Sequence, residues 1–388
     1  MASDYVINDN YILVEDDQTL NDLCQLWQDS HYLAMDTEFI RTSTFYPHVG
    51  LIQINAGAGN YLIDPLKIND WEAFKALMTR QSITKIFHSC SEDLQVFMVK
   101  LQLIPSPVFD TQIGAAFLNE GFGNSYHALV VDCFDIDLPK GETRSDWLQR
   151  PLQDKQLHYA AQDVAYLPTI YMKQLKLLEE KGRLPWFQQE CESLLNTYRK
   201  EMDADFFDYY LNIRGAWQLN SPQLHILRQL AQWREVHARK RDKPRNWIIK
   251  DKNLIDIARL MPDSFEQLGL IDDLSHNFLR HEGQEILDLV VNALAEPDEG
   301  QPVTLPQPLD GKAKSRLKKA QQYAEKKSIE LDLPVEILIR KRWLITMLQD
   351  LSLLEESPVA SPEDRLLPQE LAGWRKDLLF PGLIESMR

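Results

Sequence analysis

Strand-like patterns occur only in the first half of this 388-residue chain, and this separation constrains the fold more than any other feature. Up to about residue 200, short apolar runs of strand length alternate with stretches of helical periodicity. Beyond about residue 210 only helical periodicity remains. The chain is therefore predicted to combine an α/β domain over residues 1–200 with all-α domains after it.

Two of the predicted strands determine the kind of sheet. Val49–Ala56 and Asn60–Asp64 are separated only by Gly57-Ala58-Gly59, a connection typical of a hairpin. A hairpin pairs its strands antiparallel, so we expect a mixed sheet. The remaining expected strands are 11–14, 32–39 and 83–87. The expected helices are 17–30, 70–78, one that begins with a capping box at Ser89–Glu92, and then 111–118, 126–134 and 153–178.

The helical half is predicted to contain two domains, 211–295 and 311–388, joined by a Pro-rich linker over 296–310. Its first helix, Ser221–Lys240, is expected to start with Ser221 as N-cap and Pro222 in the first turn. Further helices are expected at 254–259, 264–268, 276–280, 283–294, 311–330, 334–347 and 368–379. Residues 246–250 resemble 335–340, and 230–235 resemble 371–376, which favours two related helical modules.

The net charge of −16 argues against a nucleic-acid partner, but the distribution of charge argues for one. Residues 234–252 hold eight Lys and Arg against three acids, and residues 311–343 hold ten against four. Such segments are typical of nucleic-acid-binding faces, although a solvated helix surface has the same composition. The candidate nucleic-acid-binding residues are Arg239, Lys240, Arg241, Lys243, Arg245, Lys312, Lys314, Lys318 and Lys319.

Other features of the sequence predict the cellular compartment and the oligomeric state. No apolar run is long enough to span a membrane, and the first residues lack the basic and apolar regions of a signal peptide. The four cysteines form no close pair, which fits a reducing cytoplasm and argues against a zinc knuckle. Because no heptad repeat occurs, we expect a monomer.

Four carboxylates in the first domain are expected to converge. Asp36 and Glu38 alternate onto one face of a strand end, and Asp93 follows a later strand. Asp163 lies on a helix, with Tyr159 one turn before it. Clustered carboxylates repel one another unless they share a cation. Such an oxygen cage suits Mg²⁺ or Mn²⁺, and two such ions can activate water and clamp both reacting oxygens of a phosphodiester. Taken singly, each of these acids is more typical of a helix cap or a surface carboxylate than of a metal ligand.

The order of these motifs resembles the DEDD superfamily of 3′→5′ exonucleases in its tyrosine-containing branch, and within it the bacterial ribonuclease D family. The first motif is carried by residues 34–42, the second by 87–94 and the third by 159–164. Residues 51–53, 109–112, 144–147 and 150–152 also resemble that family. The later chain resembles its helicase-and-ribonuclease-D C-terminal (HRDC) modules, clearly over about 216–295 and weakly after 310. The resemblance implies a ribonuclease H-like mixed-sheet exonuclease domain followed by two HRDC-like domains.

The resemblance also implies a role for each motif residue. Asp36, Glu38 and Asp163 would hold one metal ion, and Asp36 would share the second with Asp93. Tyr159 would orient the attacking water. Thr37 and Phe39 would grip the last base, although Phe39 equally suits core packing.

Further substrate contacts are implied for Arg41, Arg144 and Lys140, which would contact phosphates. His88 and Gln112 would act near the substrate or serve as structural hydrogen-bonding groups. The implied function is a metal-dependent 3′→5′ exoribonuclease that trims precursor tRNAs and other small structured RNAs. A DNA exonuclease and a nucleic-acid-binding protein with an inactive site are the alternatives.

Overall fold

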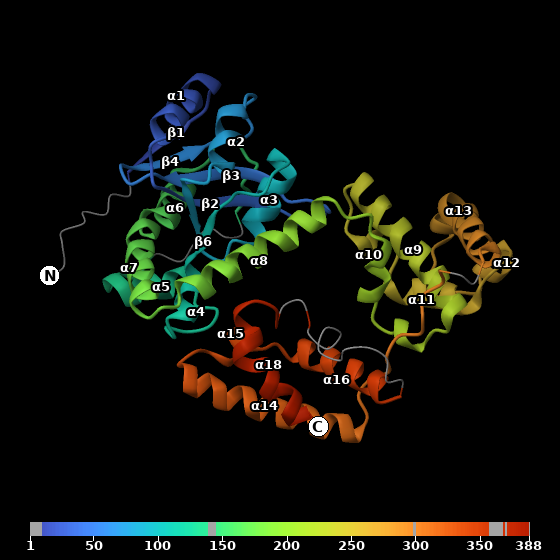
Figure 1. The fold of residues 1–388 in the computed structure, drawn as a ribbon. Coiled ribbons are helices and arrows are strands. Elements are labelled where there is room, and N and C mark those ends of the chain that lie inside the picture. Colours follow the sequence, from blue (N-terminus) through green and yellow to red (C-terminus); the bar gives the residue numbers. More distant parts are fainter. Residues whose placement is uncertain (1–9, 139–144, 298–299, 357–367, 369–370, 388) are drawn as a thin grey trace. The chain divides into compact units, whose positions relative to one another are not determined.

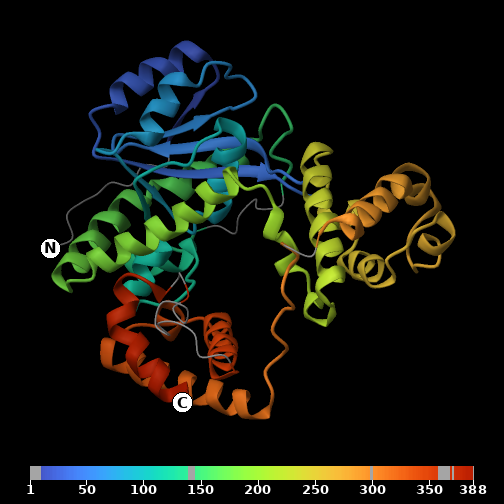
Figure 2. The same cartoon turned by 45° about the vertical axis from the view of Figure 1, so that its right-hand side comes forward.

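The computed structural model describes residues 10–138, 145–297, 300–356, 368 and 371–387, and it forms two compact units (Figures 1 and 2). The sheet unit comprises Met1–Ile40, Pro47–Met202 and Leu309–Arg388. The helical unit comprises Arg41–Tyr46 and Asp203–Pro308. The short segment Arg41–Tyr46 thus leaves the sheet unit and returns to it between two strands.

Six strands form one mixed sheet in the order β1-β4-β3-β2-β5-β6 (Figure 1). The strands are β1 (Tyr11–Val14), β2 (Tyr32–Ile40), β3 (His48–Asn55), β4 (Asn60–Ile63), β5 (Thr84–Phe87) and β6 (Val108–Asp110). The strand β3 pairs antiparallel with both β2 and β4, which confirms the predicted hairpin. The other three pairings are parallel. The three-residue strand β6 was not predicted, because so short a run carries no period-2 pattern.

The two faces of β2 pack against different helices of the sheet unit. These helices are α1 (Asp17–Trp27), α2 (Glu72–Thr79), α3 (Ser91–Leu101), α4 (Thr111–Phe117), α5 (Tyr126–Phe134), α6 (Asp154–Ala165), α7 (Leu167–Glu180) and α8 (Leu184–Met202). Leu33 and Met35 share a core with α1, α2 and α3. Ala34 shares a core with α4, α6, α7 and α8. Because side chains alternate along a strand, Asp36 and Glu38 follow Ala34 onto the face that α6 covers.

The predicted single helix Gln153–Leu178 is wrong, because the chain forms two helices there. The first, α6, ends at Ala165, and the second, α7, begins at Leu167 with Pro168 in its first turn. Proline lacks the amide hydrogen that a continuing helix needs, and it is tolerated only where a helix begins. The break leaves Tyr159 and Asp163 together on α6.

The predicted capping box at Ser89–Glu92 is also wrong. Ser89 has a positive φ of 60°, and α3 begins after Cys90 without a side-chain cap. The carboxylate of Asp110 instead accepts the amides of Ser89 and Cys90 at 3.0 and 2.9 Å. The same carboxylate caps α4 through the amide of Gln112 at 2.8 Å. One buried residue at the end of β6 therefore fixes the start of two helices, a long-range cap that no local pattern reveals.

The C-terminal helices belong to the sheet unit and share its core. They are α14 (Gly311–Leu331), α15 (Val335–Leu338), α16 (Lys341–Glu356) and α18 (Trp374–Met387). The rings of Trp374 and Phe117 lie 5.5 Å apart, and Arg375 forms an ion pair with Glu190 at 2.6 Å. Arg183 donates to the carbonyl of Leu331 at 2.8 Å. The helix expected at 334–347 is divided between α15 and α16, and α18 begins later than the helix expected at 368–379.

The helical unit packs around α9 (Ser221–Lys240). Its other helices are η1 (Phe207–Asn212), η2 (Ala216–Gln218), α10 (Arg245–Ile248), α11 (Asp251–Leu260), α12 (Phe265–Leu268) and α13 (His276–Ala295). Asn220, not Ser221, caps α9, in a capping box with Gln223. The two short helices expected over 276–294 are one helix, α13. Within the described residues no strand follows β6, and no helix is long and apolar enough to cross a membrane.

The sequence similarity between the two helical regions has a local structural counterpart. The helices α10 and α15 each span four residues, follow a proline N-cap and end at an extended isoleucine. A buried arginine supports each: Arg234 donates to the carbonyl of Ile249 at 3.2 Å, and Arg375 donates to that of Ile337 at 2.7 Å. The two arginines contact different positions, the residue after α10 and a residue inside α15, so only the matching helix lengths and flanking residues favour the hypothesis of related modules.

Candidate active site

Three of the four predicted carboxylates meet where β2 passes under α6. Carboxylate oxygens of Asp36, Glu38 and Asp163 all lie within 4.8 Å of one another, and each side chain is partly buried. Asp36 and Glu38 come from one face of β2, and Asp163 comes from the helix that covers this face. This convergence matches the arrangement expected from strand alternation and helix spacing.

Asp93 approaches the same cluster from α3. Its buried carboxylate accepts a hydrogen bond from the Thr37 hydroxyl at 2.5 Å, and Thr37 stands between Asp36 and Glu38. Asp93 is not one of the three residues within 4.8 Å of one another. Its negative charge nevertheless acts on Asp36 and Glu38, whose pKa values it raises. The charge of this fourth carboxylate thus acts on the site, although its oxygens lie outside the cluster formed by the other three.

The carboxylates of this cluster raise one another's pKa values. Burial, followed by the charges of Asp93, Asp163 and Glu38, holds the pKa of Asp36 well above its usual range. Burial and then Asp163 raise the pKa of Glu38 to about 9. Burial raises the pKa values of Asp93 and Asp163 to about 7. A hard divalent cation would remove this repulsion, and carboxylate oxygens are the ligands it prefers. The donor set therefore fits a divalent metal ion.

Tyr159 lies one helical turn before Asp163, and the two side chains form a hydrogen bond. Burial, and then the negative charges of Asp163, Glu38 and Asp36, raise the pKa of the Tyr159 phenol above its usual value. The phenol is therefore neutral at physiological pH and can act as a hydrogen-bonding group. Its ring lies beside the buried ring of Trp147, with centroids 6.3 Å apart.

Several residues that sequence reasoning did not single out hold this site in place. Arg150 donates two hydrogen bonds to Asp64, at 2.6 and 2.7 Å, and a third to the carbonyl of Gly50 at 2.7 Å. A Cβ atom at Gly50 would lie 2.4 Å from the Trp147 carbonyl oxygen, so only glycine fits there. The 144–147 and 150–152 stretches, noted above for their resemblance, thus contain residues that fix Trp147 behind Tyr159. That resemblance was the only sequence signal of this support.

The residues predicted to contact the substrate do not all have the same surroundings. Phe39 is partly buried and packs against the core. Both ring nitrogens of His88 are engaged, by the Thr111 hydroxyl at 2.9 Å and the Asn124 carbonyl at 3.0 Å. Gln112 donates to the same carbonyl at 3.0 Å. These contacts favour the structural interpretation of His88 and Gln112. Arg41 belongs to the helical unit, and Arg144 and Lys140 lie outside the described residues.

The two basic segments differ in how their charges are used. Arg239 and Arg245 both form ion pairs with the buried Glu235, and Arg241 forms a two-fold ion pair with Glu282. Lys240 and Lys243 of the same segment are exposed. In the other segment, all the predicted lysines are exposed on α14: Lys312, Lys314, Lys318 and Lys319. The prediction of a basic surface therefore applies better to α14 than to the arginines of residues 239–245.

Comparison with known proteins agrees with this fold and site. A 3'-5' exonuclease family model matches residues 11–179, and an HRDC domain model matches residues 223–290. The chain is 36% identical over 374 residues to ribonuclease D of Pseudomonas paraeruginosa, with 96% of each protein covered. It is 37% identical over 375 residues to ribonuclease D of Escherichia coli K12, covering 96% of this chain and 97% of that protein.

A solved structure matches over nearly the same length. The crystal structure of Escherichia coli RNase D, described as an exoribonuclease involved in structured RNA processing, has a TM-score of 0.87 to this chain at 34% identity. The match covers 97% of this chain and 98% of that one.

The fold and the carboxylate site together define a 3′-5′ exonuclease with an attached HRDC region. The chain belongs to the ribonuclease D family, which makes it a hydrolase of the exoribonuclease class. Members of this exonuclease superfamily work with divalent metal ions, in agreement with the acidic cluster.

Proposed function

We propose that the protein hydrolyses RNA from its 3′ end and releases 5′-mononucleotides with the help of two divalent ions, Mg²⁺ or Mn²⁺. The convergence of Asp36, Glu38 and Asp163 within 4.8 Å is the observation that best supports this proposal. These three carboxylates would hold one ion. Asp36 would share the second with Asp93, whose charge already acts on Asp36.

Ions bound there would supply a hydroxide near neutral pH and would neutralise charge on the attacking and leaving oxygens. Tyr159 keeps its proton, because burial and the neighbouring carboxylates raise its pKa. Its hydroxyl, held by Asp163, can orient the attacking water. Glu38 can accept a hydrogen bond from the 3′-terminal hydroxyl of the RNA.

The proposed substrates are RNAs with a single-stranded 3′ end, namely precursor tRNAs and other small structured RNAs. The Escherichia coli relative, whose structure spans the same length, is described as acting in structured RNA processing. Thr37 and Phe39 lie on β2 next to the proposed metal ligands, and the backbone of Thr37 and the ring of Phe39 are the proposed contacts to the last nucleotide. The exposed lysines of α14 would hold the RNA through its phosphates, which position a strand without reading its sequence.

The test is hydrolysis of a 5′-labelled RNA with a 3′ trailer in Mg²⁺ by Asp163→Asn. The variant Asp154→Asn is a matched control, because it makes the same change at an exposed position of the same helix. We expect mononucleotide release to be lost in Asp163→Asn and kept in Asp154→Asn. Wild-type rates in Asp163→Asn would overturn the proposal. A matched DNA oligonucleotide in the same assay tests the alternative of a DNA exonuclease.

We also propose that the protein acts in the cytoplasm as a monomer. All four cysteines are free thiols, and burial raises the pKa of Cys24 to about 12, which keeps that thiol in its unreactive form. This state agrees with a reducing compartment. Sedimentation of the full chain in the presence of Mg²⁺ tests the assembly state.

A further inference from the structure

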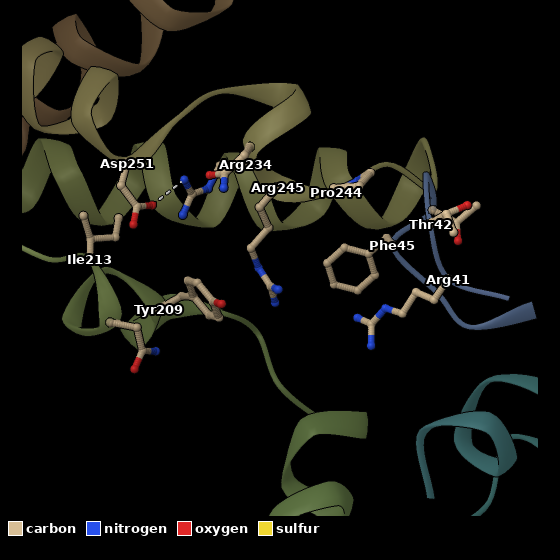
Figure 3. A pocket seen from close by; sticks show the side chains of 12 residues that line it. Arg41, Thr42, Phe45, Tyr209, Ile213, Arg234, Pro244, Arg245 and Asp251 are labelled. Carbon is tan, nitrogen blue, oxygen red and sulfur yellow. Dashed lines mark hydrogen bonds and ion pairs between the residues drawn. The ribbon is translucent and has the colours of Figure 1, made fainter. Parts of the chain in front are cut away.

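A cavity of about 450 Å³ lies within the helical unit and contains none of the proposed metal ligands (Figure 3). The segment Arg41–Tyr46 lines one side of it. Tyr209, Arg234 of α9 and residues at the starts of α10 and α11 line the other. Figure 3 shows the guanidinium groups of Arg41 and Arg245 directed toward the same open space, beside the rings of Phe45 and Tyr209. Its volume lies within the range of small-molecule sites, about 300–1,000 Å³.

The loop side of this cavity is fixed to the helical unit. The amides of Phe45 and Tyr46 both donate to one carboxylate oxygen of Asp242, each at 2.9 Å. The guanidinium of Arg239 lies 4.5 Å from the centre of the Phe45 ring. Arg41 therefore stands on a loop whose far end is held by a carboxylate and by an aromatic stack.

The guanidinium of Arg245 is held in a defined orientation. It lies 4.8 Å from the ring centres of both Phe45 and Tyr209, and its Nε atom donates to the buried Glu235 at 2.5 Å. A planar guanidinium fixed in this way loses little further freedom when it binds a phosphate. Arg245 is therefore arranged before any ligand arrives.

The charge of the lining favours an anion. Three arginines line the cavity, and the single acid among the lining residues is Asp251. Asp251 is already paired with Arg234 at 2.7 Å, as Figure 3 shows. Arg245 shares the single carboxylate of Glu235 with Arg239, so the pair keeps an excess of positive charge. A phosphate placed near Arg41 and Arg245 thus meets a net positive charge, and guanidinium groups match phosphate geometry well.

We propose that this cavity is an RNA-binding subsite that holds one nucleotide of the strand, with its phosphate at Arg41 and Arg245 and its nucleoside against Tyr209. The inference rests on the proposed function, since it takes RNA as the ligand. Aromatic rings beside phosphate-binding cations are the arrangement by which proteins hold single-stranded RNA without sequence preference. The subsite would give the helical unit a defined contact with the substrate, in addition to any diffuse attraction of its surface lysines.

The test is binding of a short 5′-fluorescein-labelled oligoadenylate to the full-length protein in EDTA, followed by fluorescence anisotropy at salt concentrations between about 50 and 200 mM. EDTA prevents hydrolysis, so binding is measured alone. Arg41→Gln should weaken binding about tenfold, because it removes a charged hydrogen bond. It should also make the slope of log K against log salt shallower by about 0.7, the value for one lost phosphate contact with a single strand.

Two further variants separate the parts of the subsite. Tyr209→Leu should weaken binding about fivefold or more by removing the stacking ring, while the salt slope stays unchanged. Arg280→Gln is the matched control, since it removes an exposed arginine of α13 outside the cavity, and it should leave both affinity and slope unchanged. Thermal melting of each variant identifies any that fail to fold. Arg41→Lys, which keeps the charge, should retain the wild-type slope.

The inference is overturned if Arg41→Gln has the affinity and slope of the wild type, or if Arg280→Gln changes both as much as Arg41→Gln does. Mononucleotide release by the wild type in Mg²⁺ is measured in parallel. Failure of that release would contradict the proposed function. Normal release together with an unaffected Arg41→Gln would contradict the subsite alone.

Discussion

The carboxylate cluster of the sheet unit and the basic segment at the end of α9 both concentrate charge of one sign, but only in the basic segment does the chain itself supply partners of opposite charge. Glu235 pairs with Arg239 and Arg245, and Glu282 pairs with Arg241. The carboxylates instead raise one another's pKa values. The comparison teaches that partly buried charges of one sign, without partners in the chain, indicate a ligand-binding site. Charges that are paired within the chain instead indicate a structural role.

The largest effect is expected at the carboxylate that acts in both proposed metal sites. Asp36→Asn should lower the rate of mononucleotide release by about 10³-fold or more, since residues that act as a unit lose most activity together. Single-turnover hydrolysis of a 5′-labelled RNA in Mg²⁺ measures this. Asp154→Asn serves again as control, and a loss of less than tenfold in Asp36→Asn would show that the cluster does not act as one unit.

A substitution at Tyr159 should affect the rate of hydrolysis much more than the affinity for RNA. Tyr159→Phe removes only the hydroxyl that bonds to Asp163, so hydrolysis should slow by about 10²-fold. Affinity for RNA in EDTA should stay within about twofold, because the ring and its contact with Trp147 remain. Equal losses in rate and affinity would assign the hydroxyl a structural role.

Removal of the carboxylate that pairs with two arginines of the basic segment should destabilise the protein. Glu235→Gln leaves Arg239 and Arg245 without their buried partner and should destabilise the helical unit by about 2 kcal/mol, less than for a fully buried pair because both arginines are partly exposed. Urea denaturation measures the change, with the exposed Glu266→Gln as control. If the segment were a free RNA-binding surface, the two variants would have the same stability.

When metal is removed, the stability of the folded protein should depend on pH through these carboxylates. Their pKa values in the folded protein, about 7 for Asp93 and Asp163 and about 9 for Glu38, lie above the values near 4 of an unfolded chain. The folded state therefore binds more protons, so in EDTA stability should fall as pH rises through this window. We expect the melting temperature to fall by a few degrees between about pH 5 and 9, with Mg²⁺ or Asp36→Asn reducing the fall. A melting temperature that rises over this range would contradict the repulsion.

The smallest effects should come from single exposed lysines. Lys318→Gln should weaken RNA binding only a few-fold and make the salt slope shallower by about 0.7, with no change in stability. Arg241→Gln removes a charge that Glu282 already neutralises and should leave the slope unchanged. Anisotropy with the same labelled oligonucleotide compares the two, and equal changes in slope would remove the distinction between balanced and unbalanced charge.

Most of the sheet unit was predictable because its elements carry strong periodic patterns. The hairpin through Gly57–Gly59, the strand that holds Asp36 and Glu38, and the pairing of Tyr159 with Asp163 on one helix all appear as expected. The site could be predicted since its chemistry requires several acids at positions that local geometry brings to one face.

The features that escaped prediction depend on contacts between residues distant in sequence. Ser89 resembles a helix cap, but the carboxylate of Asp110 does the capping from another strand. Arg241 resembles an RNA-binding residue, but it is paired with Glu282 of a later helix. Arg41 follows the catalytic strand in sequence but belongs to the helical unit. In each case a tertiary partner overrides a local pattern, and one sequence read alone does not show such partners.

The shared core of the C-terminal helices bears on how the protein can be divided for experiments. Because Trp374 packs on Phe117 and Arg375 pairs with Glu190, a chain ending at Pro308 would expose an apolar surface of the catalytic half. Loss of activity in such a truncation would then report misfolding or aggregation, not the loss of an RNA-binding module. Point substitutions on the exposed face of α14 are therefore the sounder way to examine what these helices contribute to substrate capture.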